Sequence, residues 1–253
     1  MLSELELREV FHLLFLEHLL KNADLKLYTL KGGVNLRFFF NSPRYSEDID
    51  LDVKAGSVET LKKNGYKILS DANFKRRLQS FGIQDLLIND PSKAKHTQTT
   101  QRFRLRLITA SGDELPTKIE FSRREQQSTD IKVIERINPQ LAQQYKKLPY
   151  RVQHYDGASA LKQKIEALAG RTQVQARDLF DIYLLKISGY AEALKLKDIP
   201  QDTRDKAIES AASIEYQDYE GQVLDFLERE YREQFSGQDF WIELESSLVE
   251  LLT

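Results

Sequence analysis

The chain has 253 residues, of which 41% are hydrophobic and 30% charged, and its formal net charge is −2. These values predict a globular protein of one or two domains with a sizeable core. The charge excludes a protein that attracts polyanions by its overall charge, so any contact with nucleic acid must come from local basic patches. The absence of cysteine excludes disulfides and thiolate metal sites.

The amino terminus lacks the basic region of a secretory signal. The longest apolar stretch, residues 11–20, contains His12, Glu17 and His18 and is too short to span a bilayer. We therefore expect a cytoplasmic protein that does not contact membranes. All four histidines are expected to be structural or on the surface, and none to be a catalyst.

The first part of the chain is predicted to alternate helices and strands. Ser3 and Glu6 form a capping box, which opens an amphipathic helix over 4–21. The elements expected next are a strand over 25–30, a helix over 34–40, a strand over 49–53, mainly helical structure over 57–82, and a segment over 83–89 that is either a strand or a helix end.

A glycine pair and an aspartate pair form the most informative pattern in the chain. Gly32 and Gly33 follow the first predicted strand, and Asp48 and Asp50 stand at the start of the second. Because side chains alternate along a strand, the two carboxylates project from one face. Paired carboxylates bind divalent cations such as Mg²⁺, and N–H groups at a helix start attract phosphate. The combination predicts a metal–nucleotide site, although each half alone is more often a plain turn or a solvated strand end.

A hairpin is predicted from strictly alternating residues over 102–107 and 117–121, joined by turn residues at 111–113. Its polar face carries Arg102, Arg104, Arg106, Lys118 and Glu120. If this hairpin lies beside the aspartate strand, Glu120 becomes the third carboxylate of a metal cluster. The alternative is an ordinary solvated face of an antiparallel pair.

From about residue 150 to the end the pattern is helical. We therefore predict a catalytic domain over 1–150 and a helical bundle over 151–253 that contributes to the nucleotide cleft. Asp178 and Asp181 share one helix face, and Lys164 lies one helix earlier. On spacing alone, surface ion pairing explains these residues better than a functional role does. The helices are expected at 158–168, 174–187, 202–212, 219–231 and 240–252.

Several segments resemble the motifs of one protein family, the AbiEii/AbiGii-type nucleotidyltransferase toxins. Leu30-Lys31-Gly32-Gly33 and the stretch from Ser42 to Leu51 resemble the first motif, and Lys118-Ile119-Glu120 resembles the strand of the third acidic residue. The segments 164–168 and 177–183, together with Arg171, resemble the later motifs. The resemblance covers roughly residues 27–187. Val34 departs from it, because the family commonly has Thr or Ser there, and a hydroxyl contact to phosphate is thereby lost.

The resemblance implies an α+β fold. In it a polymerase-β-like nucleotidyltransferase domain, with a mixed sheet and flanking helices, precedes an all-helical carboxy-terminal bundle. It also implies the toxin of a type IV toxin–antitoxin system, with a cognate antitoxin that need not bind the toxin tightly. Family members transfer a nucleoside monophosphate from an NTP, and some act on the tRNA acceptor end.

Each candidate residue therefore has an expected role. Asp48, Asp50 and Glu120 are expected to hold Mg²⁺ or Mn²⁺, with Glu120 also helping to deprotonate the acceptor. Gly32 and Gly33 bind the β- and γ-phosphates through backbone N–H groups, and the resemblance implies that Lys164 reaches the triphosphate. The remaining candidates are Arg177, Asp178 and Asp181 for NTP binding, where the aspartates either orient Lys164 or Arg177 or contact the nucleotide, and Arg102, Arg104 and Arg106 for RNA.

Two alternatives remain open on the sequence. In one, the acceptor is a small molecule or a protein side chain instead of tRNA or another RNA, which the near-neutral charge allows. In the other, the protein is a catalytically inactive binding module, which the three retained carboxylates argue against. The arginines at 102, 104, 106, 123 and 124 favour a polyanionic acceptor.

Overall fold

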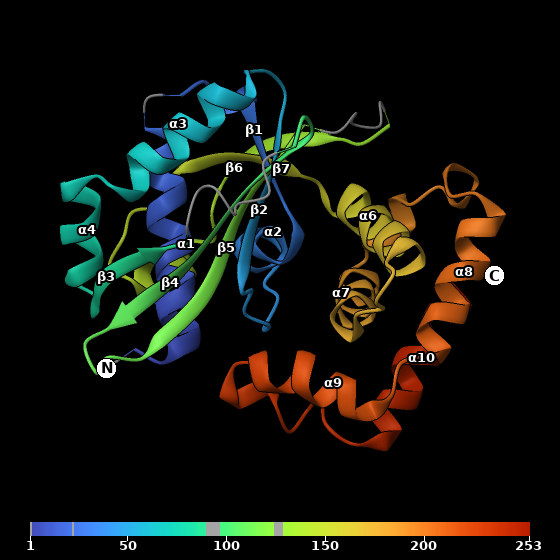
Figure 1. The fold of residues 1–253 in the computed structure, drawn as a ribbon. Helices are drawn as coiled ribbons and strands as arrows, with labels where there is room; N and C mark the ends of the chain where they lie inside the picture. Colours follow the sequence, from blue (N-terminus) through green and yellow to red (C-terminus); the bar gives the residue numbers. More distant parts are fainter. Residues whose placement is uncertain (1, 22, 90–96, 124–128) are drawn as a thin grey trace. The chain divides into compact units, whose positions relative to one another are not determined.

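The computed structural model of the protein (Figure 1) describes residues 2–21, 23–89, 97–123 and 129–253, and the chain forms two compact units. Unit 1 consists of Met1–Phe39, Tyr45–Ser128 and Lys132–Tyr155, and unit 2 of Phe40–Arg44, Thr129–Ile131 and Asp156–Thr253. Two short pieces that precede residue 150 thus belong to the second, mainly helical unit.

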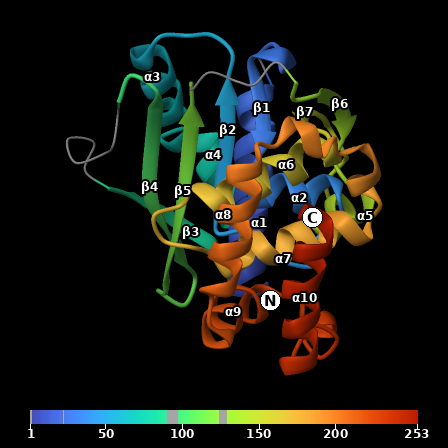
Figure 2. The same cartoon turned by 90° about the vertical axis from the view of Figure 1, so that its right-hand side faces the viewer.

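Unit 1 is built on a mixed seven-stranded sheet with the strand order β3-β4-β5-β2-β1-β7-β6. Strand β2 runs parallel to β5 and β1 parallel to β7, whereas the other neighbouring pairs are antiparallel. Figure 2 shows β4, β5, β2 and β1 side by side. The strands are β1 Tyr28–Lys31, β2 Asp48–Val53, β3 Ile83–Ile88, β4 Thr100–Thr109, β5 Glu114–Ser122, β6 Lys132–Arg136 and β7 Arg151–Tyr155. The predicted mixed sheet is confirmed, and the predicted hairpin is β4–β5.

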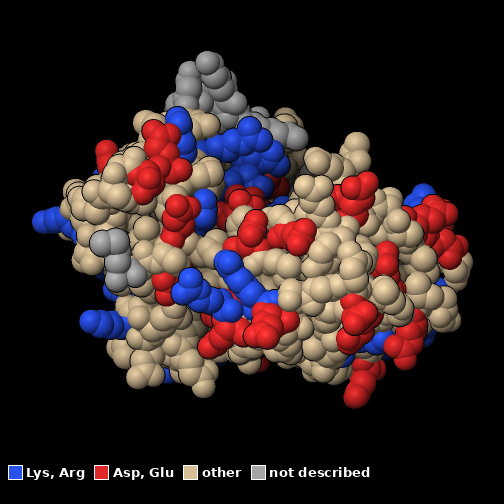
Figure 3. Space-filling view, turned by 90° about the horizontal axis from the view of Figure 1, so that it is seen from below, with Lys and Arg blue, Asp and Glu red and all other residues tan. Residues whose placement is uncertain are grey.

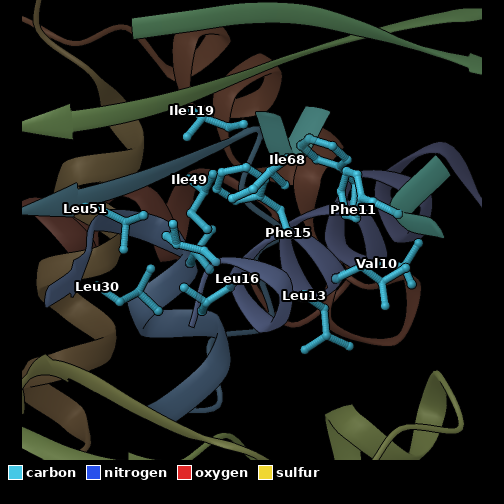
Figure 4. Packing of buried hydrophobic residues seen from close by; sticks show 14 of the residues in the cluster. Val10, Phe11, Leu13, Phe15, Leu16, Leu30, Ile49, Leu51, Ile68 and Ile119 are labelled. Carbon is cyan, nitrogen blue, oxygen red and sulfur yellow. The ribbon is translucent and has the colours of Figure 1, made fainter. Parts of the chain in front are cut away.

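Helix α1 forms the centre of the core of unit 1 (Figure 4). It begins with the predicted capping box, in which Ser3 Oγ accepts from the Glu6 N–H (3.3 Å) and the Ser3 N–H donates to Glu6 Oε2 (2.7 Å). Val10, Phe11 and Phe15 on α1 are fully buried and belong to the same apolar cluster as the inward side chains of β1, β2 and β5. The helices of unit 1 are α1 Glu4–Leu20, α2 Gly32–Phe39, α3 Val58–Leu69, α4 Ala72–Gln79 and α5 Pro139–Gln144.

Unit 2 is helical apart from one isolated bridge, Arg44 to Leu227, among its described residues. The predicted helical carboxy-terminal part is confirmed. Its helices are α6 Gly157–Gly170, α7 Ala176–Ile187, α8 Gln201–Ala212, α9 Tyr216–Gln222 and α10 Gln238–Leu252. None of the helices in the described ranges is both long and apolar enough to cross a bilayer.

Three sequence-based expectations about the elements were wrong. Residues 25–27 form a 3₁₀ turn instead of a strand, because the Asp24 side chain accepts from the Lys26 N–H. The helical pattern does not start at 150, since β7 pairs with β1 and β6 and extends the sheet to Tyr155. The helix expected over 219–231 ends at Gln222 and is followed by the 3₁₀ turns Leu224–Phe226 and Arg229–Tyr231.

His12 on α1 is only 1% exposed and lies against the sheet. Its Nε2 is 3.0 Å from Thr117 Oγ1, and the Thr117 hydroxyl donates to the Glu47 carbonyl at 2.6 Å. Because that hydroxyl proton is already committed, Nε2–H must be the donor to Thr117. Burial lowers the pKa of His12 to about 4, with the Arg8 charge lowering it further and Asp48 opposing the shift. His12 is therefore neutral and structural, as the sequence predicted.

We expect acid to destabilise the protein through His12. The unfolded chain protonates this imidazole near pH 6.5, whereas the folded protein does so only near pH 4. Stability contributed by the neutral ring is therefore complete above pH 6.5 and is lost as pH falls towards 4, at up to about 1.4 kcal/mol per pH unit. Urea unfolding at several pH values measures this slope, and His12→Gln should flatten it. A variant with the same slope as the wild type would contradict the assignment, and His18→Gln serves as the control.

Candidate active site

The two predicted carboxylate strands are neighbours in the sheet. Strand β2 pairs with β5 in parallel, so that Asp50 lies opposite Glu120 and Asp48 opposite Lys118. Ile49, between the two aspartates, is fully buried and anchors the strand in the core. Because alternate residues share a face, Asp48, Asp50 and Glu120 all project from the face opposite that core. The pairing on which the Glu120 prediction depended is therefore present.

Gly32 brings the start of α2 against Asp50. Its φ of +69° is in the left-handed region that favours glycine, and a Cβ at this position would lie 3.0 Å from Asp50 Oδ2. Helix α2 begins at this residue, directly after β1, whose Lys31 lies opposite Asp50. A helix start offers unpaired N–H groups that attract phosphate. The chain thus places a carboxylate next to a helix start, which is the kind of group that can bind phosphate.

Gly32→Ala is expected to reduce activity strongly while costing only about 1 kcal/mol of stability, because the added Cβ meets the Asp50 carboxylate and the left-handed φ is strained. Steady-state nucleotide transfer and a thermal melt measure the two effects. Gly112→Ala is the matched control, since it also has a positive φ but has nothing within 4 Å of its Cβ position. Equal activity losses in both variants would mean that Asp50 has no part in the effect.

Basic side chains from the same face pair with most of these carboxylates. Lys118 Nζ is 2.8 Å from Asp48 Oδ2, and Arg102 Nη2 is 2.6 Å from Glu120 Oε2. Further along β2, Asp52 is held by Lys31 and by the Tyr155 hydroxyl; it was not predicted as a site residue.

Asp50 differs from its neighbours, because its carboxylate makes no ion pair or hydrogen bond with any described residue. Burial raises its pKa; Lys118 and Lys31 oppose the shift, while Asp48 and Glu120 add to it. A half-buried carboxylate with acidic neighbours and no direct partner is an energetically costly arrangement that a cation would relieve.

The donor chemistry of this face fits a hard divalent cation, which prefers carboxylate oxygens. The side chains do not form a finished site, however: within the described ranges, no three His, Cys, Asp or Glu side chains are placed to hold a metal ion together. Asp48 and Glu120 are turned to Lys118 and Arg102. A metal held by Asp48, Asp50 and Glu120 would therefore have to replace these two ion pairs.

Unit 2 contains the second predicted constellation. Lys164 on α6 bridges two carboxylates of α7, with Nζ 2.9 Å from Asp178 Oδ1 and 2.6 Å from Asp181 Oδ2. Asp178 also pairs with Arg171 (2.5 Å), and Asp181 receives three hydrogen bonds from the Arg44 guanidinium. Both aspartates are fully buried. These contacts match the predicted alternative in which the aspartates orient Lys164, and the part of these residues in NTP binding stays a prediction.

The charges of this buried network do not cancel. Three cations, Lys164, Arg44 and Arg171, surround the two aspartates. Burial by itself raises the pKa of Asp178, but Lys164 and Arg171 outweigh it and lower the pKa to about 2. The predicted reading as surface ion pairs is wrong, because the carboxylates are inaccessible to water. An excess positive charge held in place this way can attract an anion.

Arg44 has no role predicted from the sequence, although it stands inside the Ser42–Leu51 motif. Its side chain is only 4% exposed and binds Asp181, far along the chain. An arginine four residues before Asp48 was the available signal, but its partner could not be inferred from spacing. Arg177, a predicted NTP-binding residue, lies half-buried in the first turn of α7, and its predicted role remains untested.

Three solved structures resemble this protein over almost its whole length. The crystal structure of JHP933 from Helicobacter pylori matches with a TM-score of 0.57 and 19% identity, covering 100% of this chain and 93% of that one. A putative nucleotidyltransferase from H. pylori (TM-score 0.58, 19% identity) covers 100% of this chain and 96% of that one. MenT4, a nucleotidyltransferase toxin from Mycobacterium tuberculosis H37Rv, matches with a TM-score of 0.56 and 16% identity over 99% of this chain and 94% of that chain.

These likenesses show that the fold is shared, and the predicted mixed sheet with flanking helices, followed by a helical carboxy-terminal part, is confirmed. Curated protein sequences give no significant match. The family described as "Nucleotidyl transferase AbiEii toxin, Type IV TA system" matches residues 14–241, which is most of the chain. The protein is therefore a nucleotidyltransferase and belongs to the AbiEii family of type IV toxin–antitoxin toxins.

Proposed function

We propose that this nucleotidyltransferase transfers a nucleoside monophosphate from an NTP to a hydroxyl of RNA, at the tRNA acceptor end, with Mg²⁺ or Mn²⁺ as cofactor. The observation that carries the proposal is the register of β2 and β5, which sets Asp50 opposite Glu120 beside the glycine that starts α2. Modification of tRNA in the cytoplasm would block translation, which is the action expected of a toxin. The proposed partners are NTP, tRNA and a cognate antitoxin.

The residues of the chain divide the chemistry among them. Asp48, Asp50 and Glu120 would hold the divalent metal, which supplies charge neutralisation at the phosphates. The N–H groups of Gly32 and Gly33 bind the β- and γ-phosphates, and Glu120 accepts the proton of the attacking hydroxyl. The acceptor oxygen then forms a bond to the α-phosphorus as the bond to pyrophosphate breaks.

Lys164 is the proposed charge partner of the triphosphate, with Arg177 as a further contact. Its ammonium is held by Asp178 and Asp181, which restrict its rotamers before any ligand arrives. A pre-positioned cation stabilises developing negative charge at a smaller entropic cost than a free lysine does. In this proposal the two buried aspartates position Lys164 and do not contact the nucleotide.

RNA is preferred over a small-molecule or protein acceptor because of the basic row on β4. Arg102, Arg104 and Arg106 alternate on the same sheet face as Glu120. The Arg104 guanidinium is exposed and forms no ion pair or hydrogen bond within the described part of the chain. Charges of both signs are mixed on the face shown in Figure 3, in keeping with a net charge of −2. A polyanion is therefore expected to bind locally.

Incubation of the purified protein with each labelled NTP, Mg²⁺ and total RNA tests the proposal. We expect label from one or more NTPs to enter the tRNA band and to be absent with Asp50→Asn. Label entering only protein or a small molecule would support the alternative acceptors. No transfer to any acceptor, with intact folding, would support the inactive binding module.

RNA affinity is expected to fall as the salt concentration rises, and Arg104 is expected to contribute more to this dependence than Arg102 or Arg106. Arg102 already pairs with Glu120, and Arg106 with Glu114 at 2.6 Å, so only Arg104 is available without breaking an ion pair. Arg104→Ser should reduce the slope of log affinity against log salt by about 0.7–0.9, and Arg106→Ser by less. Filter binding of tRNA between low and moderate salt measures the slope. An unchanged slope in Arg104→Ser would favour a small-molecule or protein acceptor.

A further inference from the structure

The ion pairs on the catalytic face, the sheet face that carries Asp48, Asp50, Asp52 and Glu120, are more accessible to water than a buried structural pair of unit 1. Lys118 and Asp48 have side chains 25% and 24% exposed, and Arg102 and Glu120 are 22% and 15% exposed. The structural pair of Arg37 with Glu9 is instead 8% and 3% exposed. Solvated pairs contribute little stability and exchange partners easily, whereas breaking a buried pair is costly.

The ion pairs of this face leave one carboxylate at its centre without a partner in the described part of the chain. Lys118 holds Asp48, Lys31 holds Asp52 and Arg102 holds Glu120. Each cation holds one carboxylate, and Asp50 alone has no partner among the described residues. Because Asp50 lies between the strand positions of its neighbours, the next positive charge to arrive is expected beside it.

We propose that Lys118 and Arg102 are exchangeable counter-ions of the catalytic carboxylates, which a divalent metal displaces and which then bind the phosphates of the incoming nucleotide. This rests on the proposed function, since it assumes a metal at Asp48, Asp50 and Glu120. Before the metal binds, the two cations lie against Asp48 and Glu120 and limit the repulsion between the carboxylates. Once the metal replaces them, they lie beside Arg104 as unpaired cations on the same face.

The exchange has a consequence for binding order. Metal alone must break two ion pairs and approach two cations, so its affinity is reduced. Metal that arrives with a triphosphate offers the released Lys118 and Arg102 a new anionic partner. The two ligands are therefore expected to bind with positive coupling, which disfavours occupation of the site by metal without nucleotide.

Replacing Lys118 tests two effects separately: the loss of the ion pair that competes with the metal, and the loss of the contact with phosphate. The probes are Mn²⁺ alone and the Mn²⁺ complex of inorganic tripolyphosphate, which avoids a choice of base, each titrated calorimetrically into the folded protein. In Lys118→Gln we expect Mn²⁺ alone to bind about fivefold more tightly and the Mn²⁺–tripolyphosphate complex about fivefold more weakly. Arg102→Gln should change both affinities in the same directions and provides a second variant should Lys118→Gln fold poorly.

Lys75→Gln is the matched control, because Lys75 also pairs with an aspartate at 2.8 Å, Asp85, but on α4 and β3. It should change neither affinity. Unchanged or weaker Mn²⁺ binding in both Lys118→Gln and Arg102→Gln would overturn the counter-ion proposal while leaving the metal site intact. If instead wild type and Asp50→Asn bind Mn²⁺ equally, or neither binds it, the proposed metal site itself fails and the exchange with it.

Discussion

Asp50→Asn is expected to reduce nucleotide transfer by about a thousandfold or more while leaving the protein folded. Asp50 is the one carboxylate of the catalytic face without a partner among the described residues, and Gly32 places the start of α2 against it. The amide keeps the shape and volume of the side chain but cannot supply the negative charge that a divalent cation needs. Asp48→Asn is expected to be similarly inactive.

The same substitution is expected to raise the melting temperature slightly. Burial raises the pKa of Asp50, which means that the folded protein disfavours its charged form. A neutral asparagine removes that cost and the repulsion from Asp48 and Glu120. Loss of activity combined with unchanged or increased stability is the signature of a functional residue and not of a structural one.

Transfer of label from NTP to RNA, together with a thermal melt in the absence of metal, measures both effects. Asp202→Asn is the control, since Asp202 pairs with Lys206 on the exposed face of α8 at 2.8 Å. Substantial activity in the Asp48→Asn, Asp50→Asn double variant would refute the proposed mechanism. A large loss of stability in Asp50→Asn would assign the residue a structural role instead.

The local patterns of unit 1 predicted the elements that carry the three candidate metal-binding carboxylates. Ile49 and Leu51 alternate with the aspartates, and both are fully buried in the structure. The β4–β5 hairpin was predictable for the same reason, because buried residues such as Phe103 and Ile119 alternate with charged ones along both strands. Such strands are predictable because one face is buried and the other is charged, which fixes the register of each side chain.

Other parts of the fold depend on contacts that no local pattern contains. Strand β7 was missed because its Gln153 and His154 are polar yet buried. The Gln153 side chain donates to Thr29 Oγ1 at 2.7 Å and to the Lys26 carbonyl at 3.5 Å. The helix predicted over 219–231 ends early for two reasons. Gly221 weakens it, and the segment that follows is held by a hydrogen bond from the Glu228 N–H to the Pro43 carbonyl at 3.0 Å. Both outcomes are decided by partners distant in the sequence.

In the candidate site, too, some features could be predicted from local spacing and others depend on contacts between distant residues. The acidic residues could be selected from their spacing, but their counter-ions could not, because Lys118 and Arg102 meet Asp48 and Glu120 only through strand pairing. The position of Asp178 and Asp181 on one helix face was predictable, whereas their burial and their link to Arg44 were not. Spacing identifies which groups share a face, and tertiary structure decides what they bind.

Lys164→Met is expected to lower the free energy of unfolding by about 3 kcal/mol, because two fully buried carboxylates each lose one ion-pair partner. Arg171 and Arg44 continue to hold Asp178 and Asp181, which keeps the loss at the lower end of what breaking a buried pair costs. Urea unfolding measures the change. Lys206→Met is the control, since that lysine makes a similar but exposed ion pair and should show no measurable change.

Asp178→Asn in the Lys164→Met background should recover part of the lost stability, because it removes a buried charge whose remaining partner, Arg171, is 41% exposed. The stability effect alone would also follow from a purely structural network, so activity must be measured where the variant is fully folded. For folded Lys164→Met we expect kcat/KM for NTP to fall by about a hundredfold or more. Lys195→Ala is the control, since Lys195 lies outside the network and its replacement should leave kcat/KM unchanged. Equal kcat/KM values for folded Lys164→Met and Lys195→Ala would mean that Lys164 supports the helices of unit 2 and has no contact with the triphosphate.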